Sequence, residues 1–400
     1  MSATRTQGLL ENLGQFSVLV LVNAFVGAMI GLERSIFPQY AQEFFGISSA
    51  SAILAFITAF GVTKAAANYF AGRWANRYGR RRILLLGWIF ALPVPLLLLY
   101  APSWSWVIIA NVLLGINQGL AWSSTVIMKI DLVGERNRGL AMGINEFAGY
   151  LAVGLAAFGT GWLAEHFGLR PYPFYLGMVI SWVGLLLSFF AVRETRDLVQ
   201  LEHSEHDQAE NVFWNTTLKN PSLSSITQAG LVNNLNDGMI WGLLPMLLLS
   251  LHFDNAQIGV LVALYPAVWG MGQLFTGRLA DRYPIKPILF IGMILQGLVI
   301  IGLTRVGGFY VIAALSICLG LGTALVYPTF LTGIAQFAHP EQRAESIGAF
   351  RLWRDLGYAI GAVISGIIAD QFGIPMAIMA IGALTLLSAV VIQLRMPRST

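Results

Sequence analysis

The chain has 400 residues, of which 56% are hydrophobic and only 11% are charged, with a formal net charge of +4. Soluble domains carry about 25% charged residues, so this chain has too few charges to solvate the surface of a soluble protein of its length, and we exclude that class. A lipid bilayer as solvent removes the difficulty. The composition therefore predicts a membrane protein.

A helix that crosses a bilayer needs about 20 mostly apolar residues. In chain order we predict twelve such helices, near residues 15–40, 49–75, 83–101, 105–131, 139–165, 172–193, 223–251, 257–280, 286–304, 308–336, 344–369 and 375–394. The first segment is too long for a signal peptide and leads into further spans, so we expect it to be retained. The pattern predicts an all-α polytopic membrane protein.

The longest polar stretch, residues 194–221, falls between the sixth and seventh predicted helices. It divides the chain into an N-terminal six-helix bundle (1–193), a linker and a C-terminal six-helix bundle (222–400). Within the linker, Phe213, Trp214 and Leu218 suggest a short amphipathic helix at the membrane surface.

Lysine and arginine predict the orientation, because they are enriched in cytoplasmic loops. If the N-terminus is cytoplasmic, the predicted outer loops hold only Arg170 and Arg305, whereas the inner loops and tails hold most of the other cations. We therefore expect both termini in the cytoplasm and the linker on the same side. The short loops and tails are typical of a bacterial inner-membrane protein. The same asymmetry explains the basic composition without a nucleic-acid partner.

An internal repeat has a fixed offset of 205 residues. The segment GRWANRYGRRRILLLG begins at Gly72, and GRLADRYPIKPILFIG begins at Gly277. The same offset relates Glu165 to Asp370. The two halves are therefore tandem copies in the same membrane orientation, an architecture in which two bundles move about a central site.

The segment from Gly72 to Arg82 resembles the loop signature of major facilitator transporters, usually G-x-L-A-D-R-x-G-R-[KR]-[KR], between the second and third helices. A degenerate copy at Gly277–Pro287 follows the eighth helix, as in that family. The resemblance covers essentially the whole chain. It implies the twelve-helix fold and transport of a solute by alternating access, rather than an enzymatic activity.

The resemblance also implies that these loops take part in the conformational change. Their arginines can pair with acids and helix C-termini, and Asp131 is an expected partner of Arg77 or Arg80. The first copy has Asn76 where the family has Asp, so we expect it to hold the bundles together more weakly. The predicted switch residues are Gly72, Arg73, Asn76, Arg77, Gly79, Arg80, Asp131, Gly277, Arg278, Asp281 and Arg282.

Two family signatures of drug/proton antiporters are absent. The position three residues before Gln118–Gly119 is Gly115 rather than arginine, and the fifth helix, which begins its polar part at Asn145, has no Gly-Pro pair. These absences argue against a standard drug/proton antiporter without excluding export.

Charges inside a bilayer cost about 3 kcal/mol or more each, so they usually face a cavity with a function. The repeat offset carries Glu146 onto Arg351, so the halves present an acid and a base at equivalent positions, and it carries Trp122 onto Tyr327. The predicted solute- and proton-binding residues are Glu33, Arg34, Lys64, Asn68, Asn117, Gln118, Trp122, Glu146, Asp237, Tyr327, Arg351, Arg354 and Asp355. Structural ion pairs and aromatic packing remain the alternative for each.

No Gly-rich nucleotide loop followed by Lys-Ser/Thr, no HExxH and no G-x-S-x-G occurs in the sequence. We expect no cofactor, no metal and no enzyme activity. The cations favour a small anionic or zwitterionic organic solute, because arginine binds carboxylate or phosphate in a bidentate manner. A lone carboxylate in a dehydrated cavity, at Glu146, Glu33 or Asp237, can carry a coupling proton.

We therefore predict a secondary transporter that works as a monomer, with a solute, protons and membrane lipids as its partners. A multidrug or metabolite efflux pump of the same fold is one alternative. A membrane sensor that has lost transport is another, although it would not need cavity charges in both halves.

Overall fold

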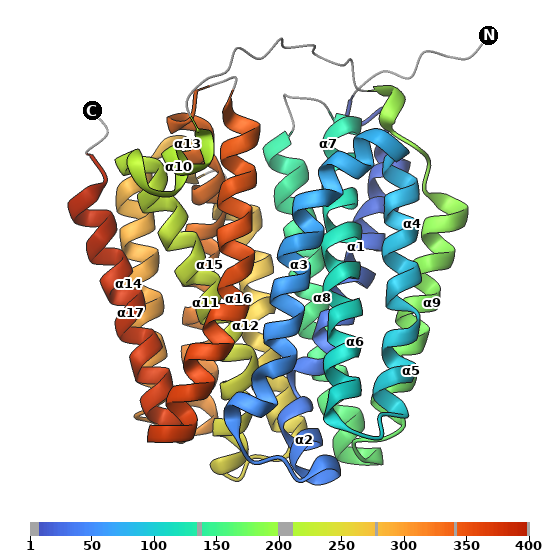
Figure 1. The fold of residues 1–400 in the computed structure, drawn as a ribbon, viewed down its shortest axis with the longest axis vertical. Coiled ribbons are helices and arrows are strands. Elements are labelled where there is room, and N and C mark those ends of the chain that lie inside the picture. Colours follow the sequence, from blue (N-terminus) through green and yellow to red (C-terminus); the bar gives the residue numbers. More distant parts are fainter. Residues whose placement is uncertain (1–7, 134–137, 199–210, 277–278, 340–341, 398–400) are drawn as a thin grey trace.

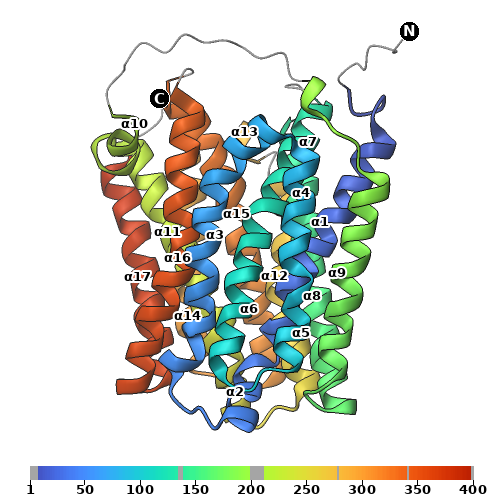
Figure 2. The ribbon, with the colours of Figure 1, turned by 45° about the vertical axis from the view of Figure 1, so that its right-hand side comes forward.

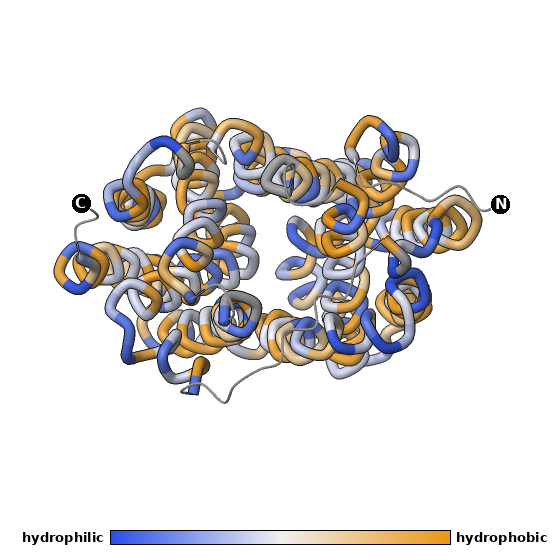
Figure 3. Tube along the Cα trace, turned by 90° about the horizontal axis from the view of Figure 1, so that it is seen from above, coloured by the Kyte–Doolittle hydropathy of each residue, from blue (hydrophilic) through white to orange (hydrophobic). Residues whose placement is uncertain are grey.

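The computed structural model describes residues 8–133, 138–198, 211–276, 279–339 and 342–397, and every secondary-structure element in these ranges is helical. Two groups of long helices lie side by side, the N-terminal group in blue to green and the C-terminal group in yellow to red (Figure 1). The view from above shows the same division (Figure 3). The predicted all-α membrane fold is confirmed.

The N-terminal group precedes the linker. It consists of α1 (Leu13–Arg34), α2 (Phe37–Phe45), α3 (Ala50–Tyr78), α4 (Arg80–Ala91), α5 (Pro93–Leu99), α6 (Trp104–Asn117), the π-helical turn η1 (Gln118–Trp122), α7 (Ser123–Val133), α8 (Arg138–Phe167) and α9 (Tyr172–Ala191).

The C-terminal group is preceded by short turns, η3 (Arg196–Leu198), α10 (Val212–Trp214) and η4 (Asn215–Lys219). It consists of α11 (Pro221–Ser250), α12 (Asn255–Thr276), α13 (Leu279–Arg282), α14 (Ile285–Leu303), α15 (Phe309–Phe337), α16 (Arg343–Phe372) and α17 (Ile374–Arg395).

Within the described residues, 11 helical segments are long and apolar enough to cross a membrane. The long helix α11 is more polar, because it carries the sequence NNLND from Asn233 to Asp237, but it runs through the C-terminal group beside the other spans (Figure 2). Most of its residues are buried, including these five. With α11 the fold has the predicted twelve spans, and its polar residues are shielded from lipid by their neighbours.

Two predicted spans are interrupted at prolines. The first, 15–40, is two helices, because α1 ends at Arg34 and α2 begins at Phe37 with Pro38 in its first turn. The third, 83–101, changes from α4 to α5 at Leu92, with Pro93 as the first residue of α5. Proline lacks an N–H donor and is tolerated at the start of a helix, which is why each break lies there.

The two groups contact each other mainly through α3 against α16 and α8 against α12. Repeat-related glycines allow this close approach. A Cβ atom on Gly161 would lie 2.7 Å from backbone atoms of α12, and one on Gly366 would lie 2.7 Å from the Cα atom of Ser51 in α3. Small residues are typical of helix interfaces in membranes for this reason.

The molecule has two ends along its helix axes. We call the end where α1 begins and α17 ends the termini face, and the end where α3 and α12 begin the far face (Figure 1). Next to the termini face, η4 packs on α16, where the Thr216 hydroxyl donates to Ser346 at 3.0 Å. Trp214 and Leu218, predicted to lie at the membrane surface, are 47% and 57% exposed.

Candidate functional site

A polar cavity lies between the two groups of helices. It is narrow in this conformation, with a free volume of about 30 Å³. Helices α3, α7 and α8 with η1 line it from one side, and α15 and α16 line it from the other. Its lining residues are Lys64, Asn68, Trp122, Ser123, Val126, Glu146, Tyr150, Tyr327, Arg351, Arg354 and Asp355.

Asp355 is the centre of a network that joins the two sides of the cavity. The Asn68 amide donates a hydrogen bond to its carboxylate, and the Ser123 hydroxyl donates to Asn68 Oδ1 at 2.6 Å. The cations Lys64 and Arg354 lie 4.0 Å and 3.6 Å from Asp355 Oδ1. Asp355 in α16 is therefore bound by residues of α3 as well as by its own neighbour.

Arg354 is held by aromatic side chains of both groups. Its guanidinium carbon lies 4.3 Å from the centre of the Tyr327 ring, a cation–π geometry, and it donates a hydrogen bond to the Tyr150 hydroxyl at 3.5 Å. Tyr150 in turn stacks on Trp269, with ring centres 3.6 Å apart. Arg354 thus occupies one face of the Tyr327 ring, so that face is not available to a solute in this conformation.

Glu146 and Arg351 are the two cavity charges for which no ion pair is found among the described residues. Glu146 Oε1 accepts hydrogen bonds from the Trp122 indole at 3.1 Å and the Asn145 amide at 3.0 Å. Its Oε2 is buried and has no hydrogen-bond partner in the described part of the chain. Arg351 is half-buried, and no ion pair of it is found among the described residues. The π-helical turn η1, a feature common at functional sites, contains Trp122 at its last position.

The cavity lining has a formal excess of positive charge. It contains three cations, Lys64, Arg351 and Arg354, against two carboxylates, Glu146 and Asp355, which leaves a net charge of +1 when all are ionised. Such a balance favours a solute with an anionic group.

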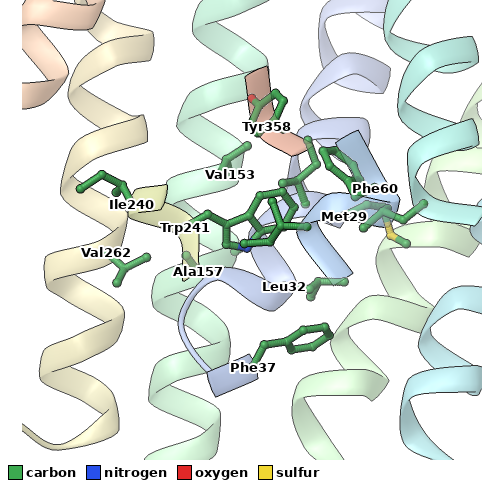
Figure 4. Packing of buried hydrophobic residues seen from close by; sticks show 14 of the residues in the cluster. Met29, Leu32, Phe37, Phe60, Val153, Ala157, Ile240, Trp241, Val262 and Tyr358 are labelled. Atoms are coloured by element: carbon green, nitrogen blue, oxygen red, sulfur yellow. The ribbon is translucent and has the colours of Figure 1, made fainter. Parts of the chain in front are cut away.

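An ion pair crosses between the two groups of helices outside the cavity lining. Arg34 at the end of α1 binds both carboxylate oxygens of Asp237 in α11, at 3.0 Å and 3.2 Å. The two side chains are 2% and 0% exposed. The Arg34 guanidinium also lies 4.7 Å from the centre of the Trp241 ring. Trp241 packs among apolar residues of both groups, among them Phe60 and Tyr358 (Figure 4).

Other predicted residues lie inside the N-terminal group, outside the cavity lining. Glu33 is buried and accepts one hydrogen bond from Asn111 at 3.3 Å, while its other oxygen has no hydrogen-bond partner in the described residues. Asn117 donates to the Gly87 carbonyl at 3.0 Å, and Gln118 donates to the Val26 carbonyl at 2.7 Å. The two amides thus bind α6 and η1 to their neighbours.

The predicted loop after α3 pairs within its own group. Arg80 Nε lies 2.9 Å from Asp131 Oδ2, and both side chains are buried, so Arg80 rather than Arg77 is the partner of Asp131. Glu194 accepts the backbone N–H groups of Arg80 and Arg81 at 3.0 Å and 3.1 Å, and so caps α4.

The other predicted switch residues make fewer contacts. Gly79 takes a positive φ of 98°, as the tight turn between α3 and α4 requires. Arg73, Asn76 and Arg77 are exposed, and a Cβ atom on Gly72 would meet open space. In the second copy Arg282 is exposed, whereas Gly277, Arg278 and the side chain of Asp281 lie outside the described residues.

Sequence reasoning missed Tyr150 and Trp269. Tyr150 lies one helical turn after Glu146, and the offset of 205 relates it to Asp355, so the repeat together with helical periodicity could have found it. Trp269 is related in the same way to Lys64. The repeat thus places different residue types at equivalent positions of one site.

Residues 19–233 and 226–400 match the sequence profile of the Major Facilitator Superfamily. The multidrug resistance protein MdtG of Salmonella typhimurium is 26% identical over 359 residues, which cover 87% of this chain and 86% of that protein. Among solved structures, the nucleoside transporter NupG has a TM-score of 0.79 at 12% identity and covers 96% of this chain and 100% of its own. The human organic anion transporter MFSD10 has a TM-score of 0.70 at 15% identity, with 96% and 99% covered. The chain therefore belongs to the major facilitator superfamily.

Proposed function

We propose that this transporter carries a small organic anion or zwitterion across the membrane by alternating access, driven by coupled protons. The observation that supports it most is the cavity between the two groups of helices, lined by three cations and two carboxylates. Buried charges are costly, and cavities that retain them usually bind a charged solute. Alternating access would require the helices of residues 1–193 and 222–400 to move as two bundles joined by the linker 194–221.

The proposed orientation places the termini face in the cytoplasm of a bacterial inner membrane. The turn between α3 and α4, at the termini face, is rich in arginine, whereas Arg170 and Arg305 belong to connections at the opposite end. Cytoplasmic loops carry this excess of positive charge. Both bundles belong to one chain, so a monomer suffices for transport.

Two buried carboxylates for which no ion pair is found among the described residues are available for the coupled proton. Glu33 and Glu146 each keep one oxygen without a hydrogen-bond partner in the described residues, whereas both oxygens of Asp237 are bound by Arg34. Glu33 does not line the cavity, so its protonation need not displace the solute. We therefore assign the proton to Glu33 first and treat Glu146 as a solute-facing group.

Ligand-dependent thermal stability of the detergent-purified chain tests the solute class. A bound solute stabilises the folded state by RT ln(1 + [L]/Kd), so true solutes raise the melting temperature with dose. We expect anions or zwitterions to stabilise the protein and neutral analogues to have no effect. Stabilisation by neutral compounds alone would contradict the proposal.

Proteoliposomes test the coupling once a stabilising solute is known. We expect Glu33→Gln to abolish accumulation driven by a proton gradient, while exchange of solute across the membrane survives. Glu146→Gln should instead weaken solute binding. If a proton gradient drives no accumulation in the wild type, or if it still drives accumulation in Glu33→Gln, the assignment of the proton is wrong.

A second candidate function is efflux of several unrelated compounds. It is supported by the similarity to MdtG, which is described as a multidrug resistance protein. This candidate predicts that bulky lipophilic cations stabilise the protein and that the carboxylates of the cavity bind them. The same thermal experiment, extended to such cations, separates the two functions.

A further inference from the structure

The cavity charges fall into two classes. Lys64 and Arg354 both pair with Asp355, with Asn68, Tyr150 and Tyr327 completing their environment. Glu146 and Arg351 stand apart from this network. The first has a buried carboxylate oxygen without a hydrogen-bond partner, and the second has no ion pair among the described residues.

These two residues occupy equivalent positions in the repeat. Glu146 lies in α8 of the N-terminal group and Arg351 in α16 of the C-terminal group, 205 residues later, and both line the same cavity. Repeat-related positions lie at matching depths on opposite sides of the site. The cavity therefore has an unused acceptor on one wall and an unused bidentate donor on the other.

We propose that the solute is a zwitterion that bridges the two groups of helices, with its ammonium group on Glu146 Oε2 and its acidic group on Arg351. This inference rests on the proposed function and narrows its solute class. An ammonium group supplies the N–H donor that Glu146 Oε2 lacks. A carboxylate, phosphonate or phosphate supplies the oxygen acceptors that fit the arginine fork.

The geometry also implies discrimination by charge. A solute with only an acidic group leaves Glu146 Oε2 buried and unpaired, and one with only an amine leaves Arg351 without its acceptor. An unpaired buried polar group weakens binding substantially, whereas a matched pair binds through charge-assisted hydrogen bonds. Trp122, whose indole N–H binds the other oxygen of Glu146, lies beside the proposed ammonium position and holds the carboxylate in place.

A matched chemical series tests this inference. The probes are free amino acids of increasing side-chain size, each with its N-acetyl derivative, which is anionic, and its amide, which is cationic. Binding is measured on the full chain in detergent by thermal shift and by tryptophan fluorescence. We expect at least one zwitterion to bind about tenfold or more tightly than both of its derivatives, a free-energy difference of the size expected for one lost charged contact.

Two variants then assign each end of the solute. Glu146→Gln should remove the preference over the N-acetyl derivative and keep the preference over the amide. Arg351→Gln should remove the preference over the amide and keep the preference over the N-acetyl derivative. Glu146→Asp and Arg351→Lys, which keep the charges, should retain most of both preferences. The melting temperature of each unliganded variant shows whether it is folded.

Three outcomes would overturn the inference. The first is N-acetyl derivatives that bind as tightly as the zwitterions, which leaves an anion transporter and so spares the proposed function. The second is that both Gln variants are folded but lose binding of the zwitterions, the N-acetyl derivatives and the amides to the same extent. The third is stabilisation by lipophilic cations but by no zwitterion or anion, which overturns the proposed function as well.

Discussion

At both ends of the molecule a carboxylate caps the start of a helix, but the two ends differ in whether the capped helix belongs to the other group. At the far face, the Asp370 carboxylate of α16 accepts the N–H groups of Ala50 and Ser51 at the start of α3, at 2.6 Å and 3.1 Å. The repeat-related Glu165 of α8 accepts the N–H group of Asn255 at the start of α12, at 2.9 Å. Each carboxylate thus caps a helix of the other group.

At the termini face, the corresponding contact stays within one group. Glu194, the first residue of the linker, caps α4, and Asp131 binds Arg80, so these bonds involve only the N-terminal group and the residue that directly follows it. The hydrogen bonds and ion pairs found between the two groups in the described residues lie at the far face and at the depth of the cavity. The comparison indicates that this conformation is closed at the far face, and that the two caps are among the contacts that must break when that face opens.

The largest effect is expected from the ion pair that joins the groups at mid-depth. Asp237→Asn leaves the Arg34 guanidinium buried without a carboxylate, and breaking a buried pair in this way costs about 3–5 kcal/mol. We expect a large drop in the unfolding temperature of the purified protein, measured by thermal denaturation.

A double variant provides the control for this pair. Arg34→Met combined with Asp237→Leu removes both charges, and replacement of a whole buried pair by apolar residues is often neutral. The double variant should therefore be more stable than the single one. A single variant as stable as the wild type would show that the pair does not hold the groups together.

The second effect concerns the two far-face caps, which differ in strength. Asp370 also accepts hydrogen bonds from the hydroxyls of Ser49 and Ser51, whereas the contact found for Glu165 is the single one to Asn255. Loss of a helix cap costs about 0.5–2 kcal/mol. We expect Asp370→Ala to raise the population open at the far face about tenfold, and Glu165→Ala about twofold to threefold.

Cysteine labelling measures that population. Leu54 is 1% exposed and packs against Gly242 across the interface, so Leu54→Cys, in a chain with Cys318→Ala, should react with a soluble maleimide only when the far face opens. Glu43→Ala is a matched control, because Glu43 is an exposed acid of α2 that pairs with Gln39 in its own helix. Equal labelling of the Asp370, Glu165 and Glu43 variants would show that the caps do not control opening.

Hydropathy predicted the twelve spans, and the charged residue types within them marked the candidate site. They could not predict which charges pair. Arg34 and Asp237 lie 203 residues apart, and their contact depends on the rotation of α1 and α11 about their axes, which no local pattern specifies. Eight predicted residues, from Lys64 to Asp355, line one cavity, whereas Asn117 and Gln118 have the same polarity and depth but face neighbouring helices. Helical periodicity is ambiguous where a π-helical turn such as η1 shifts the register.

The smallest effect is expected from a substitution at the termini face. Asn76 is exposed and stands where the repeat-related loop has Asp281, and no hydrogen bond from it to the C-terminal group is found among the described residues. Asn76→Asp adds a carboxylate that can cap a helix of the C-terminal group once the termini face closes, a gain of about 0.3–1 kcal/mol. Under the proposed alternating access, closing that face opens the other, so we expect Leu54→Cys labelling to rise about twofold to fivefold. Asn76→Ser, which adds no charge, should leave the labelling unchanged. If Asn76→Asp lowers the labelling or leaves it unchanged, this loop does not stabilise the closed termini face. Some other contact must then compete with the far-face caps.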